Sequence, residues 1–528
     1  MKNKILWAMG AGLLLMAAVS CRKESDILLS YDYADALAFN AADTSFAAKF
    51  QVIWNGMNQH YSIWDYEAEQ GLDWDAVYEE YYPKFEALDR RGKNATVTDE
   101  ELTELLRGCL GPLHDGHFHF DVKNHKTGNT VSYAPASDRN AQREDYATTA
   151  SFSPNLFYYA DPSHGEVETD ENGYPIVMEY STSPLVMLNR FLTVPGQGYL
   201  WAREKAQELH ALSSPTEMQA FQLEQLINFS VEFAEISGKP MDVALEIYNR
   251  LWLKYSFLNI PGFDYIDPAF SDKGIRFTYA LLKGNIAYFY VSGFSMVNYL
   301  DEKEIQTSFN MDDPAIRNHV EQMRAVWKAW FDTVQQLHRN GTLGGVILDV
   351  RGNHGGRTDD FQYFVGSLLP SGGLQYGYQR FKRGTGRYDY SPLMPGYAVT
   401  MKDPHETITE PVVLLCNCHS VSMAEMSTLG VKIMENGTVI GKRTWGGLCP
   451  LGGNEYNSLS YSGFIGVEGK TPVFGYVPML AALTLDKKPI EGQGVTPDID
   501  VDLDVDLFQA TGQDTQLDRA LQFLRSGQ

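Results

Sequence analysis

The chain has 528 residues, of which 44% are hydrophobic, and a formal net charge of −24 at pH 7. Because a chain of this length is too long for one hydrophobic core, we expect two or three domains. The negative charge argues against nucleic acid as a partner, since phosphate binding needs clustered Lys and Arg, and it argues equally against adhesion to an anionic membrane by charge alone.

The first twenty residues have the pattern of an export signal. Two lysines precede an apolar run over residues 5–19 that is too short to span a membrane comfortably. The run ends in Ala18-Val19-Ser20-Cys21, which resembles the cleavage site of bacterial lipoproteins, although Ala18 stands where that pattern usually has Leu. We therefore expect a signal peptide at 1–20, a lipid on Cys21 and a tether at 21–44. The expected location is the outer membrane of a Gram-negative cell envelope, facing the periplasm or the cell surface. The alternative is an ordinary secretory signal with an incidental cysteine.

Apolar residues recur at helical spacing between residues 45 and 120, which predicts a helical N-terminal domain. Its last helix begins at the capping box Thr98-Asp99-Glu100-Glu101 and ends at Gly111-Pro112. Residues 121–272 give mixed signals, with a polar, Tyr-rich stretch followed by two helices near 215–235 and 240–255. We interpret 121–272 as a mixed, partly helical insert without a chemical motif of its own.

Strand and helix patterns alternate over residues 273–510, which predicts an α/β domain with a mixed, largely parallel sheet. Pro314 is at the first position of a long helix that ends at Gly341. Residues 345–350 and 412–416 are continuous apolar runs, as in strands that are covered on both faces. Residues 511–528 are expected to form a C-terminal helix or tail.

A glycine-rich turn follows the first of these two strands, in Asp349-Val350-Arg351-Gly352-Asn353-His354-Gly355-Gly356. Glycines allow backbone N–H groups to point at an anion. A phosphate-binding P-loop would continue with Lys and then Ser or Thr, which are absent here. The turn is therefore either an oxyanion hole or a tight connection without chemistry, in which Asp349 and Arg351 pair to shape the chain.

Two serines follow the second strand and open a helix, in Cys416-Asn417-Cys418-His419-Ser420-Val421-Ser422-Met423-Ala424-Glu425. A serine at a helix N-terminus is most often a cap for backbone N–H groups. It can also be a nucleophile, because the free N–H groups and the helix dipole stabilise a neighbouring oxyanion. Ser420 and Ser422 both satisfy these physical conditions.

The order of these motifs resembles the S41 peptidase family of C-terminal processing proteases and the tricorn core protease. That family has Asp-x-Arg-x-Asn-x-Gly-Gly, then Ser-x-Ser-x-x-Glu, then Ile-Gly-x-x-Thr-x-Gly, and ends in a Gly-x-Pro-Asp-Ile turn. The last two correspond here to Ile440–Gly446 and Gly494–Ile499. The helical region resembles the tricorn-like branch through Trp54, Tyr61, Gly71–Trp74 and Leu113–His117. The resemblance implies a crotonase- or ClpP-like α/β core and a serine peptidase that acts on peptides or unfolded proteins.

The resemblance also implies roles for single residues. Ser422 aligns with the nucleophile, and Gly447 occupies the position at which the processing-protease branch has its Lys. The tricorn-like branch instead implies His117 as the base and Glu491 as the residue that orients it. The implied oxyanion hole consists of backbone N–H groups of Gly355, Gly356 and Met423. We expect no cofactor, and the sequence leaves the oligomeric state and the pairing of the cysteines open.

The sequence leaves several alternatives open. His114, His117 and His119, with nearby aspartates, have residue types that suit zinc, although their spacing is irregular. Glu491 has the alternative of an ordinary surface carboxylate. No PDZ domain is recognisable, and the insert at 121–272 takes its place in the chain. The alternative for the whole protein is a catalytically inactive S41-fold protein that binds an apolar ligand or a protein partner.

Overall fold

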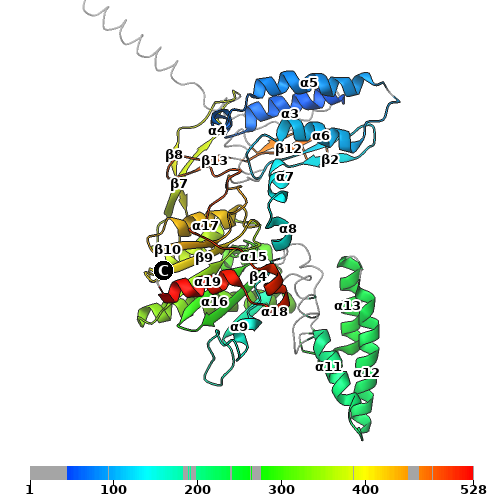
Figure 1. Cartoon of the computed structure of the whole chain (residues 1–528), viewed down its shortest axis with the longest axis vertical. Coiled ribbons are helices and arrows are strands. Elements are labelled where there is room, and N and C mark those ends of the chain that lie inside the picture. Colours follow the sequence, from blue (N-terminus) through cyan, green and yellow to red (C-terminus); the bar gives the residue numbers. More distant parts are fainter. Residues whose placement is uncertain are drawn as a thin grey trace, which may run out of the picture. The chain divides into compact units, whose positions relative to one another are not determined.

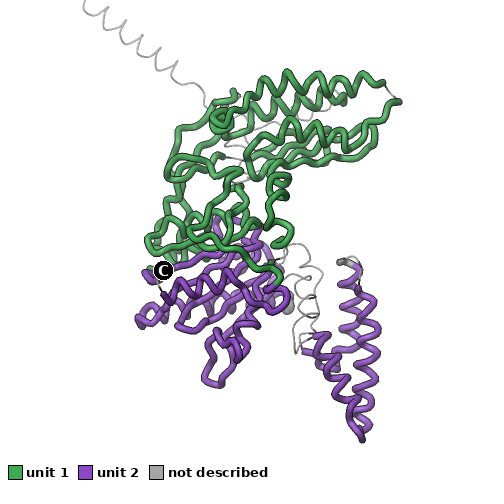
Figure 2. Tube along the Cα trace, viewed as in Figure 1, with its two compact units in different colours: residues 1–152, 361–407, 416–506 green, residues 153–360, 408–415, 507–528 purple. Residues whose placement is uncertain are grey.

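The computed structural model divides the chain into two compact units (Figure 2). Unit 1 comprises residues 1–152, 361–407 and 416–506, and unit 2 comprises 153–360, 408–415 and 507–528. The signal peptide, Cys21 and nearly all of the expected tether lie outside the described residues. The structure describes residues 44–526, except for 93, 151, 182–187, 189–190, 192–197, 238, 240, 262, 264–274, 385, 450–462 and 479.

The helical region predicted at the start of the chain is present in unit 1. Ser45 and Asp73 accept backbone N–H groups through their side chains at the N-termini of the first and third helices. The predicted capping box of Thr98 and Glu101 opens the fourth helix. These caps satisfy amides that have no partner within a helix. The four helices are α3 Phe46–His60, α4 Trp64–Glu69, α5 Trp74–Arg90 and α6 Asp99–Leu110.

Two antiparallel sheets and one parallel strand pair belong to unit 1. The four-stranded sheet has the order β11-β12-β1-β2, with β11 Phe464–Ile465, β12 Val473–Tyr476, β1 His119–Lys123 and β2 Thr130–Tyr133. The three-stranded sheet has the order β13-β7-β8, with β13 Leu480–Thr484, β7 Leu374–Phe381 and β8 Met394–Ala398. Strand β10 (Gly437–Gly441) pairs in parallel with β14 (Ile499–Asp500). The helices of this part are α7 Pro135–Ala141, α8 Tyr146–Thr149, η6 Val365–Leu368 and α17 Met423–Lys432.

Unit 2 contains a mixed sheet with five successive strands in the order β9-β6-β5-β4-β3. Strands β5, β6 and β9 run in parallel, whereas β3, β4 and β5 pair antiparallel. Every residue of β5, β6 and β9 is buried, which explains the continuous apolar runs in the sequence. The predicted α/β architecture is thus confirmed. The strands are β3 Val177–Ser181, β4 Arg276–Leu282, β5 Ile286–Val291, β6 Gly345–Asp349 and β9 Val412–Cys416, whose last residue is in unit 1.

The remaining helices of unit 2 flank this sheet or form the insert. The predicted long helix is α16 (Pro314–Arg339), and the predicted C-terminal helix is α19 (Thr515–Ser526). Helices α11, α12 and α13 lie side by side in Figure 1 and bury an aromatic-rich core of their own, which includes Phe191, Phe229 and Tyr248. The other elements are α9 Phe157–Ala160, α11 Gly198–His210, α12 Glu217–Phe233, η2 Ala234–Ile236, α13 Met241–Tyr255, η3 Ser256–Leu258, α14 Val297–Leu300 and α15 Glu302–Ser308. The helices η5 Thr358–Tyr363 and α18 Val505–Thr511 cross the boundary between the units.

The cysteines and the apolar character of the helices concern the described chain as a whole. Cys109, Cys416, Cys418 and Cys449 are all buried free thiols, so none of the pairings that the sequence allows is present among them. Within the described ranges, we find no helix with the length and apolar character that crossing a membrane requires.

Candidate active site

Ser422 is the N-cap of α17 and has an unusual backbone conformation. Its φ of 58° and ψ of −114° lie far from the extended angles that N-cap residues normally adopt. A positive φ is uncommon for any residue other than glycine, and such strain is found mainly at functional sites. The side chain is half-buried at the start of a helix whose first turn is buried. This conformation distinguishes Ser422 from an ordinary capping serine.

Glu425 lies three residues after Ser422 and holds the surrounding backbone. One carboxylate oxygen accepts the N–H groups of Ser422 and Gly447, at 3.2 and 2.6 Å. The other accepts the hydroxyl of Thr444 and the N–H of Gly446, at 2.6 and 2.8 Å. Burial raises the pKa of Glu425, and these four donors oppose the rise. Glu425 therefore connects the turn at Ser422 to the loop at 444–447.

His117 lies two residues before strand β1, in a turn that Asp115 shapes. Asp115 Oδ1 accepts the N–H groups of His117 and Phe118, at 2.7 and 3.0 Å. Burial lowers the pKa of His117 to about 4, and a backbone hydrogen bond with Cys449 opposes this shift. The imidazole is therefore neutral at neutral pH, which is the form that a general base requires.

Glu491 is a buried carboxylate, so the alternative of a surface residue is wrong. Its Oε2 accepts the N–H of Gly116 at 2.9 Å, and its Oε1 accepts the N–H of Cys449. Burial, followed by the proximity of Asp115, raises the pKa of Glu491 to about 8. Glu491 thus joins the residue next to His117 to the end of the 444–449 loop.

A close backbone contact brings these segments together within unit 1. A Cβ atom on Gly116 would lie 2.0 Å from the carbonyl oxygen of Gly446, so only glycine fits there. The indole of Trp445 donates to the carbonyl of Gly116 at 3.0 Å, and the N–H of Gly492 donates to the carbonyl of Gly446 at 2.8 Å. Glu425 bonds to this same loop, and so backbone contacts connect the segments of Ser422, His117 and Glu491. Among the described residues, no hydrogen bond joins these three side chains directly.

The predicted oxyanion-hole residues differ in whether their amides are available. The N–H of Gly355 donates to Asn353 Oδ1 at 2.8 Å, so it is already used. The amides of Gly356 in unit 2 and Met423 in unit 1 form no hydrogen bond with any described residue. Met423 is the first residue of α17, where amides normally lack a helical partner.

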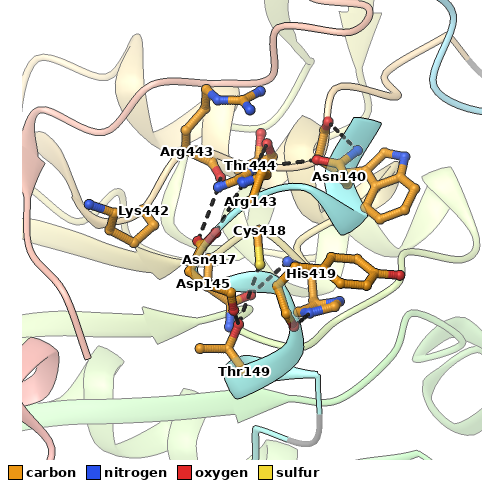
Figure 3. Close-up of polar contacts among 12 residues, drawn as sticks. Asn140, Arg143, Asp145, Thr149, Asn417, Cys418, His419, Lys442, Arg443 and Thr444 are labelled. Carbon is orange, nitrogen blue, oxygen red and sulfur yellow. Dashed lines mark hydrogen bonds and ion pairs between the residues drawn. The ribbon is translucent and has the colours of Figure 1, made fainter. Parts of the chain in front are cut away.

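A polar cluster that the sequence did not indicate contacts the segments on both sides of Ser422 (Figure 3). The guanidinium of Arg143 pairs with Asp145 and donates to the backbone carbonyls of Arg443 and Thr444, at 2.6 and 3.0 Å. The neighbouring segment contacts the turn itself, because His419 Nε2 lies 2.7 Å from the carbonyl oxygen of Tyr146. Cys418 Sγ and Thr149 Oγ1 lie 3.3 Å apart. Residues 140–149 thus hold both loops that flank Ser422.

The histidines near His117 have separate partners. His114 Nδ1 lies 2.7 Å from a carboxylate oxygen of Glu67, and the ring of His119 packs edge-on against Phe474 and Tyr476. In the part of the chain that the structure describes, no group of three or more His, Cys, Asp or Glu side chains is arranged to hold a metal ion.

Comparisons with known proteins identify a family for part of the chain. The family model described as peptidase family S41 matches residues 318–501, and the comparison with curated proteins gives no match. Among solved structures, a candidate peptidase from Parabacteroides merdae is similar at 16% identity and a TM-score of 0.43, over 91% of this chain and 97% of that chain. Mature CPAF is similar at 10% identity and a TM-score of 0.42, over 92% and 98% of the two chains. The photosystem II D1 C-terminal processing protease is similar at 18% identity and a TM-score of 0.25, over 43% and 46%. The matched segment includes Ser422 and Glu491, and over this segment the chain is similar to peptidase family S41.

Proposed function

We propose that this protein is a serine peptidase that hydrolyses peptide bonds through an acyl-enzyme on Ser422. The observation that carries the proposal is the left-handed backbone of Ser422 at the start of a buried helix. A capping role does not need this conformation, whereas a nucleophile on a sharp strand-to-helix turn typically has it. The family match to residues 318–501 supports the same reaction class.

In the proposed reaction, His117 is the general base. Burial keeps its imidazole neutral, so it can take the proton of the Ser422 hydroxyl as Oγ attacks the carbonyl carbon of the scissile bond. The imidazolium then donates this proton to the leaving amine as the C–N bond breaks. A water molecule, activated by the same imidazole, releases the acyl group and restores Ser422.

Two other parts of the site support this reaction. Within unit 1, the amide of Met423 is an available donor for the oxyanion, because it forms no hydrogen bond with any described residue. Glu491 is the third residue of the proposed triad. It holds the segment of His117 through the amide of Gly116, and in its ionised form it stabilises the imidazolium.

A fluorophosphonate probe tests the proposal, because it forms a covalent bond only with an activated serine. We expect labelling of the wild-type protein, with loss of the label in Ser422→Ala and a decrease of at least about 100-fold in labelling rate in His117→Ala. Ser420→Ala is the matched control, because Ser420 is two residues away and buried, and it should still be labelled. An unlabelled but folded wild type would instead favour a binding protein for an apolar ligand or a protein partner.

The proposal includes export and a lipid anchor on Cys21, which the pattern of residues 1–21 supports. Its substrates would then be peptides or unfolded proteins outside the cytoplasm. Metabolic labelling with an alkyne fatty acid should modify the wild type and not Cys21→Ser. Equal labelling of both would contradict the anchor, and recovery of the unprocessed chain from the cytoplasm would contradict export.

A further inference from the structure

Two buried polar atoms without partners lie two residues apart in the turn that carries the proposed general base. Asp115 Oδ2 and His117 Nδ1 are both inaccessible to solvent, and neither forms a hydrogen bond with any described residue. The Asp115 side chain is fully buried. An unsatisfied buried donor or acceptor destabilises a fold by about 1–3 kcal/mol, so two of them in one turn call for an explanation.

The turn itself fixes the orientation of the Asp115 carboxylate. Oδ1 accepts the amides of His117 and Phe118, at 2.7 and 3.0 Å, so the carboxylate cannot rotate away without breaking both bonds. Oδ2 therefore stays next to the residue that carries the imidazole. A neutral imidazole has one N–H donor, and a carboxylate oxygen is the acceptor that most often orients such a ring.

Glu491 differs from Asp115 because both of its carboxylate oxygens have hydrogen-bond partners. Each of its oxygens already accepts a backbone amide, one from Gly116 and one from Cys449, and these bonds join two loops. A third buried carboxylate, Glu67, is likewise occupied, because it bonds to Tyr61 and to the amide and ring of His114. Among the described carboxylates around His117, Asp115 alone has an oxygen with no partner.

We infer that Asp115 is a positioning residue for catalysis, whose Oδ2 accepts the Nδ1–H of His117 and orients the imidazole toward Ser422. The inference rests on the proposed function and adds to the role of Glu491 without replacing it. In this inference, one hydrogen bond from Nδ1–H to Oδ2 satisfies both unpaired atoms. It also sets the tautomer, because a proton held on Nδ1 makes Nε2 the acceptor for the proton of the serine, and the hydrogen bond of the imidazole with the backbone of Cys449 is then released.

Asp115→Asn separates this role from that of the turn. The asparagine side chain of this variant would keep an Oδ1 that accepts the amides of His117 and Phe118, and it would replace Oδ2 with an NH2 group that cannot accept a hydrogen bond. We expect the fluorophosphonate labelling rate to fall about 100-fold or more. We also expect the acid limb of the pH–rate profile to move to lower pH. Burial raises the pKa of Asp115 to about 7 and lowers the pKa of His117 to about 4, so the contacting pair takes up a proton nearer neutral pH than the histidine alone. Asp121→Asn, on the adjacent strand, is the control and should label at the wild-type rate.

Other titratable groups surround Asp115, and their charges also affect the pH–rate profile. Four of them become negatively charged when they ionise, so they repel a second negative charge, whereas Arg139 donates to backbone carbonyls, including that of Asp115 at 3.2 Å. None of these residues is replaced in Asp115→Asn, but the pKa of Glu491 falls when the Asp115 charge is lost. The shift of the acid limb is therefore read together with the NMR signal of the His117 imidazole. The groups are Glu67, Tyr61, Glu491, Cys449 and Arg139.

The outcomes distinguish this inference from the proposed function. If the wild type is labelled and Asp115→Asn has the same rate and profile, the inference is wrong and the peptidase proposal stands. A slower rate with an unmoved acid limb also overturns it, because that result indicates a structural role only. If the wild type is not labelled, or Asp115→Asn does not fold, proton NMR of the wild type decides. A low-field imidazole N–H signal that is lost in His117→Gln supports the contact, and its absence contradicts it.

Discussion

The two units each bury a cluster of charged side chains, and the clusters differ in how completely they are paired. In unit 2, Arg351 is fully buried and donates to Asp349, Asp514 and Gln516. In unit 1, Asp115 and Glu491 are equally buried, but neither forms an ion pair with Lys or Arg among the described residues. A paired cluster is sufficiently explained by structure, whereas an underpaired one destabilises the fold and is retained where it has a function.

The paired cluster connects the glycine-rich turn to the end of the chain. Asp514 Oδ1 accepts Arg351 Nη1 at 2.9 Å and also the amides of Gln516 and Leu517 at the start of α19. The hydroxyl of Tyr288 donates to Asp349 at 2.8 Å. The interpretation that Asp349 and Arg351 pair to shape the turn is therefore confirmed, and the same pair anchors the C-terminal helix.

The largest change in stability is expected when the ion pairs of the Arg351 cluster are removed. Arg351→Met leaves Asp349 and Asp514 buried without their cation, so the free energy of unfolding of unit 2 should fall by about 3–5 kcal/mol. Urea unfolding, followed by a probe in unit 2, measures the change. Arg324→Met is the matched control, because Arg324 pairs with Glu302 on the surface and its loss should change the unfolding free energy by about 0–1 kcal/mol. Equal effects of the two variants would show that pairing does not distinguish the clusters.

A smaller change in stability is expected from Arg143, which belongs to the polar cluster of residues 140–149 near Ser422. Arg143→Lys keeps the charge but loses the planar fork that reaches Asp145 and the carbonyls of Arg443 and Thr444. We expect the unfolding free energy of unit 1 to fall by about 1.5–3 kcal/mol, with slower fluorophosphonate labelling.

Arg107→Lys is the control for this variant, because Arg107 is also an ion-paired arginine, with Glu104 and Asp138 as partners, but is exposed. It should leave both the stability and the labelling rate nearly unchanged. If Arg143→Lys is destabilised but keeps its labelling rate, the Arg143 cluster stabilises the fold without positioning the candidate active site.

The sequence indicates the parts of the site that have local patterns. The Ser422-x-x-Glu425 spacing is that of a capping box, and it could have indicated that Glu425 binds the amide of Ser422. The strands before Ser422 and Gly355 are readable because they are continuously apolar. The burial of Glu491 is not readable, because it lies among turn residues that resemble an exposed loop.

Other contacts depend on residues that are distant in sequence and have no periodic pattern. Arg143 lies between two short helices and contacts a loop about 300 residues later. Arg351 reaches Asp514 in the same way, over 163 residues. Such contacts follow from the tertiary fold, since a single charged residue in a polar segment gives no signal of its partner.

The smallest effect concerns the pH dependence of stability in the underpaired cluster. Burial and Asp115 raise the pKa of Glu491 to about 8, so the folded protein retains a proton that the unfolded chain releases above the ordinary glutamate pKa. Stability is therefore lost as the pH rises from about 4.5 to about 8. Glu491→Gln removes this loss because glutamine does not ionise. The unfolding free energy of the variant, relative to wild type, should rise by at most about 1.4 kcal/mol between about pH 6.5 and 7.5.

This pH range isolates the carboxylates from His117. The pKa of His117 is lowered to about 4, so its own contribution to stability is lost as the pH falls below the ordinary histidine value of about 6.5. Glu101→Gln is a suitable control, because Arg91 lowers the pKa of Glu101 and glutamine retains the capping box. Its difference from wild type should stay constant over the same pH range. If Glu491→Gln shows the same constant difference, Glu491 is ionised in the folded protein. The underpaired cluster would then carry its full negative charge. It would differ from the Arg351 cluster because it lacks a cation, and not because its carboxyl groups are protonated.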